Sequence, residues 1–182
     1  MNAPIPIIDV GGLAAGDPAA LARIARDVGV AARDVGFFGI TGHGVVHALR
    51  EAVFAAADAF FALPQEKKAP LAIDRVGGNR GWIAPGTEAL DPTTRPDAKE
   101  AFNIGFDPPD GPTRNGWPDL PGFRETMEAW FAAVFRLGLD LHRFVGVDLG
   151  APEDTFAHAF DTPMATLRLL RYPPVDDAWS VD

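Results

Sequence analysis

The sequence predicts an α+β fold, and two observations carry that prediction. Three long segments, residues 18–35, 46–63 and 121–144, repeat apolar residues at steps of three and four, which is typical of helices with one buried face. Two shorter segments, residues 37–41 and 166–172, are rich in β-branched, aromatic and leucine side chains and predict strands. Helices and strands therefore follow one another in separate runs along one chain.

The N-terminal part begins with an apolar run at residues 5–8, which predicts a short strand. Asp17 and Pro18 then predict the start of the first helix, because Asp caps helix N-termini well and Pro fits the first helical turn. Gly36 ends this helix. The strand at residues 37–41 follows, and we expect it to be buried.

The remaining elements surround a loop-rich middle. Pro64 ends the second helix. Residues 69–121 hold many of the prolines and glycines, and we expect loops there around two short strands near residues 81–83 and 101–104. Pro121 begins the longest helix, whose apolar stripe is typical of a core helix. Long loops that carry aromatic side chains indicate packed, functional loops.

Composition excludes several classes of protein. The 182 residues include 16 Lys and Arg against 25 Asp and Glu, and this net charge of −9 argues against nucleic-acid and anionic-membrane partners. There is no cysteine, and Ser180 is the only serine, so thiol chemistry and a serine-hydrolase elbow are excluded. The N-terminus lacks the features of a secretory signal, and no apolar segment is long enough to span a membrane. We expect a cytoplasmic protein.

The four histidines are candidate metal ligands, but none is assigned. His43 and His47 are four residues apart, as metal ligands often are, yet no carboxylate accompanies them at ligand spacing. His142 and His158 are expected to be packed or capping residues. No His-x-Asp or His-x-Glu pair occurs, so an iron site of two histidines and a carboxylate cannot be assembled from a local motif. We therefore predict no metal ligand and no catalytic residue in this chain.

The glycine turn at residues 42–44 has two interpretations. A Gly-x-Gly turn between a strand and a helix resembles the start of a dinucleotide-binding loop. His47 occupies the place where that fingerprint needs a third small residue. A turn that needs glycine for its tight geometry is the favoured interpretation.

Side chains alternate along the last predicted strand. Arg168, Leu170 and Tyr172 fall on one face, and Leu169 and Arg171 fall on the other. The planar fork of Arg suits a carboxylate and Tyr can add a hydrogen bond, so the first face would suit an anion pocket. A solvated polar face on an edge strand explains the same spacing, and spacing alone leaves both interpretations open.

Seven segments occur in an order typical of one known family. They are residues 5–9 (IPIID), 36–44 (GFFGITGHG), 60–68 (FFALPQEKK), 79–82 (NRGW), 99–102 (KEAF), 115–118 (NGWP) and 167–174 (LRLLRYPP). Each is weak alone, but together they are spread over nearly the whole length of the chain, from residue 5 to residue 174. On these segments the chain resembles the N-terminal half of the isopenicillin N synthase-like Fe(II)/2-oxoglutarate-dependent oxygenases.

The resemblance implies a helical N-terminal region packed on the first strands of a double-stranded β-helix, or jelly roll, which is incomplete in this chain. It implies a dioxygenase N-terminal region at residues 1–120, and a long core helix and first jelly-roll strands at residues 121–182. Members of the family use Fe(II), O2 and 2-oxoglutarate to oxidise a C–H bond. Their His-x-Asp pair, second iron histidine and Arg-x-Ser pair would lie beyond Asp182.

The resemblance also assigns four site residues. Tyr172 is assigned to cofactor binding, because it matches the tyrosine that contacts the carboxylate of the co-substrate or substrate beside the iron. Arg80, Phe102 and Arg168 are assigned to substrate binding, since they match a loop arginine, a strand position and a pocket position of some members. A structural role is the alternative for each of the four.

Two functions follow from the resemblance. The first is the N-terminal part of an oxygenase that acts on a small organic molecule, with the missing C-terminal half or a second copy of the chain as partner. The second is a non-catalytic remnant or binding module of the same fold. Neither Fe(II) nor 2-oxoglutarate is expected to bind well to this chain alone. Because the last strand would lack neighbours, we also expect the isolated chain to associate or to be poorly soluble.

Overall fold

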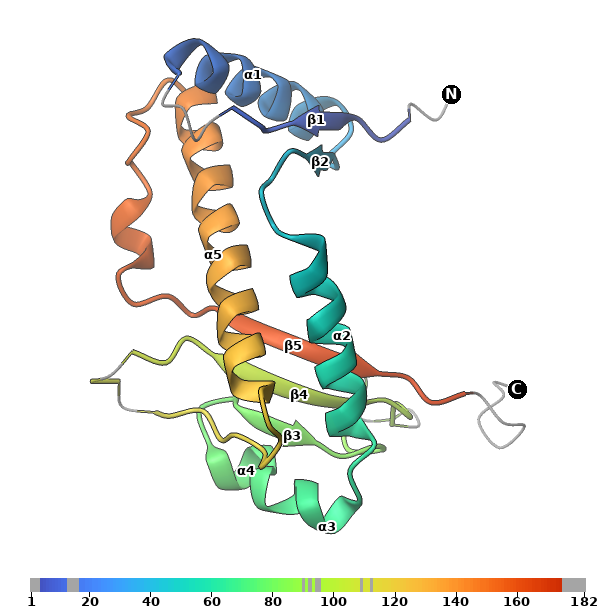
Figure 1. Ribbon diagram of the computed structural model, residues 1–182. Helices are drawn as coiled ribbons and strands as arrows, with labels where there is room; N and C mark the ends of the chain where they lie inside the picture. Colours follow the sequence, from blue (N-terminus) through green and yellow to red (C-terminus); the bar gives the residue numbers. More distant parts are fainter. Residues whose placement is uncertain are drawn as a thin grey trace. The chain divides into compact units, whose positions relative to one another are not determined.

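A computed structural model gives the fold (Figure 1). It describes residues 4–12, 17–89, 91, 93, 96–108, 110–111 and 113–174. The described chain combines helices with two small sheets, one of two strands and one of three, as the α+β prediction requires. No helix of the described residues is long and apolar enough to cross a membrane.

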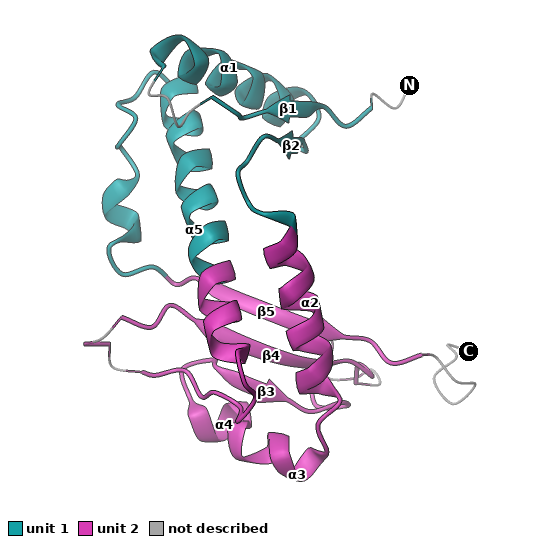
Figure 2. Cartoon of the chain, in the orientation of Figure 1, with its two compact units in different colours: residues 1–47, 131–163 teal, residues 48–130, 164–182 magenta. Residues whose placement is uncertain are grey.

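The chain forms two compact units (Figure 2). The first contains residues 1–47 and 131–163, and the second contains residues 48–130 and 164–182. The long helix α5 (Phe123–Asp148) contributes residues to both. The two units are defined by how compactly their residues pack. The predicted division at residue 120 separates a family N-terminal region from the start of a jelly roll, which is a different property. That division therefore stays a prediction.

In the first unit, two short strands pair in parallel and two helices complete the core. β1 (Ile7–Asp9) pairs with β2 (Gly39–Thr41), and α1 (Pro18–Asp34) begins where it was predicted. The Asp17 carboxylate caps α1 by accepting a hydrogen bond from the Ala19 backbone N–H at 2.9 Å. The buried apolar side chains come from β1, α1 and α5 and the residue after β1: Ile8, Val10, Ile24, Ala25, Val28, Ala31 and Phe144.

One expectation for this unit is wrong in detail. The strand predicted at residues 37–41 begins only at Gly39, and Phe37 is 71% exposed. Pairing with β1 starts where the Gly39 N–H donates to the Pro6 carbonyl at 2.8 Å, so the chain before Gly39 has no strand partner. An aromatic residue at the end of a β-rich run is therefore not evidence of burial.

A glycine allows α1 and α5 to approach within the first unit. Arg33 near the end of α1 forms a salt bridge with Asp148 at the end of α5. A Cβ on Gly29 would collide with the Asp148 carboxyl group. The hydrogen bonds of Asp148 raise the pKa of Arg33 above its ordinary value.

The second unit places helices on one face of a three-stranded antiparallel sheet. The strand order is β3 (Gly81–Ile83), β4 (Glu100–Gly105), β5 (Thr166–Arg171). All three strands lie where the sequence predicted them. The helix α2 (His47–Phe61) and the first turns of α5 pack over the sheet (Figure 1). Three short helices connect α2 to β3: α3 (Gln65–Lys68), η2 (Ala69–Leu71) and α4 (Ile73–Val76).

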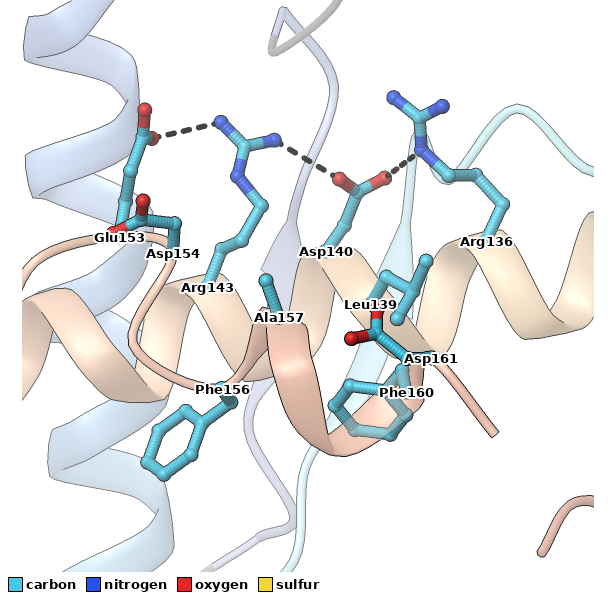
Figure 3. Close-up of a pocket in the computed structure, with 10 residues that line it drawn as sticks. All are labelled: Arg136, Leu139, Asp140, Arg143, Glu153, Asp154, Phe156, Ala157, Phe160 and Asp161. Atoms are coloured by element: carbon cyan, nitrogen blue, oxygen red, sulfur yellow. Dashed lines mark hydrogen bonds and ion pairs between the residues drawn. The ribbon is translucent and has the colours of Figure 1, made fainter. Parts of the chain in front are cut away.

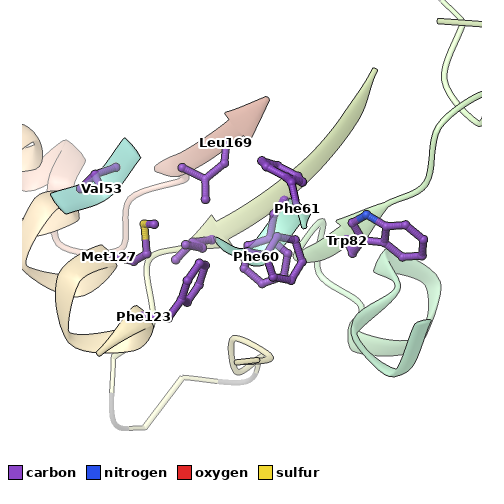
Figure 4. Close-up of a cluster of buried hydrophobic side chains, with 9 residues drawn as sticks. Val53, Phe60, Phe61, Trp82, Phe123, Met127 and Leu169 are labelled. Atoms are coloured by element: carbon purple, nitrogen blue, oxygen red, sulfur yellow. The ribbon is translucent and has the colours of Figure 1, made fainter. Parts of the chain in front are cut away.

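Aromatic rings fill the space between these helices and the sheet (Figure 4). The ring centroids of Phe60 on α2 and Phe102 on β4 are 4.5 Å apart, and that of Phe123 on α5 lies 5.8 Å from Phe102. Such tilted and edge-to-face contacts are favourable beyond the apolar area they bury. The buried members of this core are Val53, Phe60, Phe61, Trp82, Phe102, Ile104, Phe123, Met127 and Leu169.

A buried carboxylate lies beside this core. Glu100 Oε2 accepts hydrogen bonds from Lys68 Nζ at 2.7 Å and from Trp82 Nε1 at 2.9 Å, and the more exposed Arg171 approaches Oε1 at 3.8 Å. Lys68 Nζ also donates to the Phe61 carbonyl at 3.1 Å. Glu100 is 7% exposed and Lys68 is 4% exposed, so this pair is shielded from water. It joins β4 to β3, α3 and the end of α2.

Removing one partner of this pair will destabilise the second unit. We expect Lys68→Met to lower the free energy of unfolding by about 3–5 kcal/mol, because it leaves a buried carboxylate without its nearest counter-charge. The exposed neighbour Lys67 supplies the matched control, and Lys67→Met should change stability by less than about 0.5 kcal/mol. Urea titration followed by tryptophan fluorescence measures both. Equal effects of the two substitutions would contradict the account.

Two helical glycines provide a matched pair for the first unit. Gly29→Ala should lower the thermal midpoint, because the new methyl group displaces Asp148 from Arg33. Gly138 in α5 has open space around its Cβ position, so Gly138→Ala should stabilise the chain by up to about 1 kcal/mol through helix propensity alone. Differential scanning calorimetry compares them. A rise in the midpoint for both variants would show that the approach of Gly29 to Asp148 is unimportant.

Candidate functional site

The face of the sheet opposite the aromatic core carries the predicted site residues of β5. The β4–β5 register pairs Asn103 with Arg168 and Ala101 with Leu170, whereas Phe102 pairs with Leu169 on the core side. Because side chains alternate along strands, Asn103 and Arg168 lie side by side on the second face. Arg168 and Leu170 therefore share a face, as the sequence predicted. We call the residues Asn103, Arg168 and Leu170 the polar sheet face.

Asn103 is the least expected member of the polar sheet face. It is 3% exposed, and its Nδ2 donates to the backbone carbonyl and to Oδ1 of Asn79, each at 3.3 Å. A backbone carbonyl can only accept, so this contact fixes the orientation of the Asn103 amide. The Asn103 Oδ1 atom is buried and has no hydrogen-bond donor. Leaving such an acceptor unpaired costs about 1–3 kcal/mol.

Asn79 reaches Asn103 from an unusual backbone conformation. Its φ of 58° lies in the left-handed region, and it is the one non-glycine residue with a positive φ in the described parts of the chain. Gly77 and Gly78 before it also have positive φ angles, of 79° and 61°. Three successive residues with positive φ form a tight turn, which brings the Asn79 carbonyl against β4.

Arg168 is held by a carboxylate from the loop after β3. Its Nη2 donates to Glu88 Oε2, and both side chains are about one-third exposed. Lys99 Nζ lies 3.5 Å from the same Glu88 oxygen and also pairs with Asp97. The hydrogen bond to Asp97 is the main cause that raises the pKa of Lys99 above its ordinary value. The predicted substrate residue Arg168 therefore already has a carboxylate partner.

Arg80 fastens loops to the end of β4. Its guanidinium donates to the Thr113 and Phe106 carbonyls and packs where a Cβ on Gly105 would lie. Asn115 completes this arrangement, because its side chain both accepts from the Gly105 N–H and donates to the Gly105 carbonyl at 2.9 Å. These contacts give Arg80 the structural role that the sequence left open as the alternative. Its contact with substrate stays a prediction.

Phe102 and Tyr172 lie in opposite surroundings. Phe102 is fully buried in the aromatic core, on the sheet face away from Asn103, where it contacts Phe60 and Phe123. Tyr172 follows the end of β5 and is 69% exposed. Phe102 thus has a packing role, whereas the Tyr172 side chain is exposed. The predicted roles of Phe102 in substrate binding and of Tyr172 in cofactor binding are not tested by this geometry.

The described residues do not fit an iron site. Within the described ranges no three His, Asp or Glu side chains lie together as a metal ion would require. His43 lies in the turn at residues 42–44, where its Nδ1 accepts from the Val45 N–H at 3.1 Å, and His47 begins α2. His142 Nδ1 lies 2.7 Å from the Gly138 carbonyl, and His158 lies 3.6 Å from Asp161. We therefore derive no chemical step through iron from these residues.

The turn at residues 42–44 follows the glycine interpretation. Gly42 and Gly44 have φ angles of 67° and 73°, which other residues rarely adopt. A Cβ on Gly42 would collide with Asp9 and with the backbone of Gly11. The glycines are explained by backbone geometry and close packing.

The first unit carries an open groove of about 520 Å³ (Figure 3). Four of its charged side chains pair with one another: Arg143 donates to Asp140 at 3.0 Å and to Glu153 at 2.9 Å, and Arg136 lies 3.6 Å from Asp140. The hydrogen bond with Glu153 is the main cause that raises the pKa of Arg143. Both of its arginines already have carboxylate partners, as Arg168 has. No described residue that lines the groove carries a buried unpaired polar atom such as Asn103 Oδ1, so the groove is a weaker site candidate than the polar sheet face.

Comparison with known proteins defines the class of protein. The family model described as "non-haem dioxygenase in morphine synthesis N-terminal" matches residues 5–120. The chain therefore belongs to the non-haem dioxygenases of the Fe(II)/2-oxoglutarate type, which confirms the predicted family.

Several relatives support this membership. The chain is 33% identical to the 2-oxoglutarate-Fe(II) type oxidoreductase hxnY of Emericella nidulans, over 92% of this chain and 52% of the relative. It is also 33% identical to the Validamycin A dioxygenase of Streptomyces hygroscopicus subsp. limoneus, over 97% of this chain and 52% of the relative. The chain thus spans about half the length of the curated relatives it matches.

Solved structures show the same fold. A full-length Neurospora crassa protein in complex with alpha-KG matches with a TM-score of 0.82 and 32% identity, over 96% of this chain and 56% of that protein. The structure of the same Neurospora crassa protein with both alpha-KG and thymine matches with a TM-score of 0.78 and 31% identity. That match covers 93% of this chain and 55% of the other.

Sequence reasoning missed three residues that organise the second unit: Glu88, Glu100 and Asn103. The available signal was an amide residue inside the strand predicted near residues 101–104 and a charged residue directly before it, since strands buried on both faces are usually apolar. The partner of each comes from a distant segment, and spacing cannot supply it.

Arg80 can be tested by a conservative substitution. We expect Arg80→Lys to lower the free energy of unfolding by about 1–3 kcal/mol, because one ammonium group cannot reproduce the fork that satisfies the Thr113 and Phe106 carbonyls. The exposed Arg75 on α4 is the control, and Arg75→Lys should be within about 0.5 kcal/mol of the parent chain. Chemical denaturation measures both. Unchanged stability of Arg80→Lys would mean that Arg80 is free for another role.

Proposed function

We propose that this chain supplies the helical N-terminal region and the first jelly-roll strands of a non-haem Fe(II)- and 2-oxoglutarate-dependent oxygenase, which oxidises a small organic substrate with O2. The observation that carries the proposal is the match of nearly the whole chain to about half of enzymes named as 2-oxoglutarate-dependent oxygenases. We place the enzyme in the cytoplasm, since composition gives no signal for another destination.

The role of this chain in such an enzyme would be to form substrate contacts. Fe(II), when bound, supplies the centre at which O2 is activated, and its protein ligands would come from outside the described residues. Arg168 would donate to an oxygen of the substrate, and Tyr172 would contact the carboxylate of 2-oxoglutarate or of the substrate. The buried side of β4 would hold these strands in place through Glu100.

A second candidate is a binding module of the same fold without catalysis. The lack of a metal-binding cluster among the described residues favours it. The two candidates differ in what they need in order to function. The oxygenase requires a complementary polypeptide, whereas the binding module does not. Both candidates expect the isolated chain to bind Fe(II) and 2-oxoglutarate poorly.

Formation of succinate from 2-oxoglutarate distinguishes the candidates. The purified 182-residue chain with Fe(II), ascorbate and 2-oxoglutarate should form no succinate above the protein-free control. A chimera that continues after Pro174 with the C-terminal half of the Validamycin A dioxygenase should form succinate and consume O2. A matched chimera whose first iron histidine is replaced by Ala is the control.

Two results would change this proposal. Succinate formation by the 182-residue chain alone would contradict the assignment of the iron ligands to another segment. A folded chimera that binds Fe(II) but never turns over 2-oxoglutarate would favour the binding module.

Self-association is a separate expectation of the oxygenase proposal. Leu170 and Tyr172 are 46% and 69% exposed, and β5 has a hydrogen-bonded neighbour on one side only among the described strands. Sedimentation velocity of the isolated chain should show dimers or larger species that increase with concentration. A clean monomer with a cooperative thermal transition would contradict this expectation.

A further inference from the structure

We propose that Asn103 and Arg168 together recognise a small organic acid that carries an O–H or N–H group next to its carboxylate, and that Glu88 occupies Arg168 in the place of that carboxylate. This inference rests on the proposed function, because it names the substrate class of the same sheet face. The inference goes beyond the proposed function because it gives roles in ligand binding to Asn103 and Glu88, to which the resemblance assigned no role.

Asn103 carries a hydrogen-bond acceptor without a partner. Asn103 Oδ1 is buried without a donor, while Asn103 Nδ2 is committed to Asn79. The amide therefore cannot turn over to improve its contacts without placing its oxygen against the Asn79 carbonyl. What the site lacks is a donor, so a bound molecule that offers an O–H or N–H would satisfy it.

Arg168 places a hydrogen-bond donor next to this acceptor. Arg168 is the direct partner of Asn103 in the β4–β5 register, so both side chains leave the same sheet face from adjacent strands. A guanidinium only donates hydrogen bonds and suits a planar carboxylate. The pair thus combines an acceptor and a cationic donor at neighbouring positions. A 2-hydroxy or 2-amino acid carries the complementary groups on adjacent carbon atoms.

Arg168 already has a carboxylate partner. Glu88 places a carboxylate on the Arg168 guanidinium, and it is shared with Lys99. Both members of the Arg168–Glu88 pair are about one-third exposed, and exposed ion pairs contribute little to stability. Exchange of Glu88 for the carboxylate of a ligand therefore costs little. Lys99, which lies 3.5 Å from Glu88 Oε2, remains as a cationic partner for Glu88 after the exchange.

Two acids that differ by one hydroxyl group test the inference. Mandelate offers a carboxylate and an adjacent O–H, and phenylacetate is the same molecule without the hydroxyl. Binding to the 182-residue chain is measured by two-dimensional ¹H–¹⁵N NMR, which follows the Asn103 Nδ2 and Arg168 Nε signals, with each enantiomer of mandelate used separately. We expect one enantiomer to bind about tenfold more tightly than phenylacetate, because only its hydroxyl satisfies Asn103.

Three substitutions separate the contributions. Asn103→Leu should abolish the preference for mandelate while leaving the binding of phenylacetate unchanged. Arg168→Gln should weaken both acids about tenfold or more, since the charged partner of the carboxylate is lost. Glu88→Gln should strengthen both about two- to fivefold, because it removes the competing carboxylate. Glu128→Gln, which breaks an exposed pair with Arg124 on α5, is the control and should change neither affinity.

The outcomes distinguish this inference from the oxygenase proposal, because the measurement needs neither Fe(II) nor 2-oxoglutarate. Equal binding of mandelate and phenylacetate would overturn the role of Asn103. Unchanged affinities in Glu88→Gln would overturn the role of Glu88. A folded Asn103→Leu variant, shown by its thermal transition, is required for the comparison, and Asn103→Ser provides a second variant. Loss of the mandelate preference in either folded variant supports the inference.

Discussion

Glu100 is the residue on which the second unit depends. Its buried carboxylate accepts from a lysine of α3 and from the indole of β3, and that lysine also donates to the last residue of α2. An isolated charge in this position would be unfavourable by several kcal/mol, roughly the scale of the stability of a whole small domain. Glu100 can therefore be buried only when Lys68, Trp82 and the end of α2 are all in their folded positions. A single carboxylate in this way fixes the position of β4 against two helical segments and a neighbouring strand.

The consequence for function lies on the other face of β4. Because side chains alternate along a strand, fixing Glu100 and Phe102 toward the helices turns Asn103 toward the opposite face. There Asn103 lies beside Arg168 of β5 and donates a hydrogen bond to Asn79, whose backbone is in the left-handed region. On the core face, the aromatic side chains pack against one another and the buried Glu100 carboxylate is paired with Lys68. The polar sheet face keeps an unpaired acceptor and an arginine with an exchangeable partner, which is the character expected of a binding surface.

The elements of the fold were predictable because their signals are local. Asp17 and Pro18 start α1, and the β3, β4 and β5 strands follow short β-rich runs. Phe37 was the exception, since pairing with β1 and not the residue type decides where β2 begins. The family was also recognisable, because seven short segments keep their order along the chain.

The site was less predictable, because its interactions join segments far apart in the sequence. Arg168 meets Glu88 across 80 residues, and Lys68 meets Glu100 across 32. Arg80 illustrates the difficulty: its position resembles a substrate-binding arginine, yet its guanidinium fastens the carbonyls of Thr113 and Phe106. Asn103 gave only the weak signal of an amide inside an apolar strand. Its importance follows from a missing donor, which no spacing rule reveals.

Native-state hydrogen exchange of the Glu100→Gln variant tests the central dependence most directly. The account predicts that the amides of β3 and β4 lose most of their protection together, while the amides of α1 in the first unit keep theirs. Unchanged protection of β4 in Glu100→Gln would contradict it, because the strand would then be held in place without the buried carboxylate.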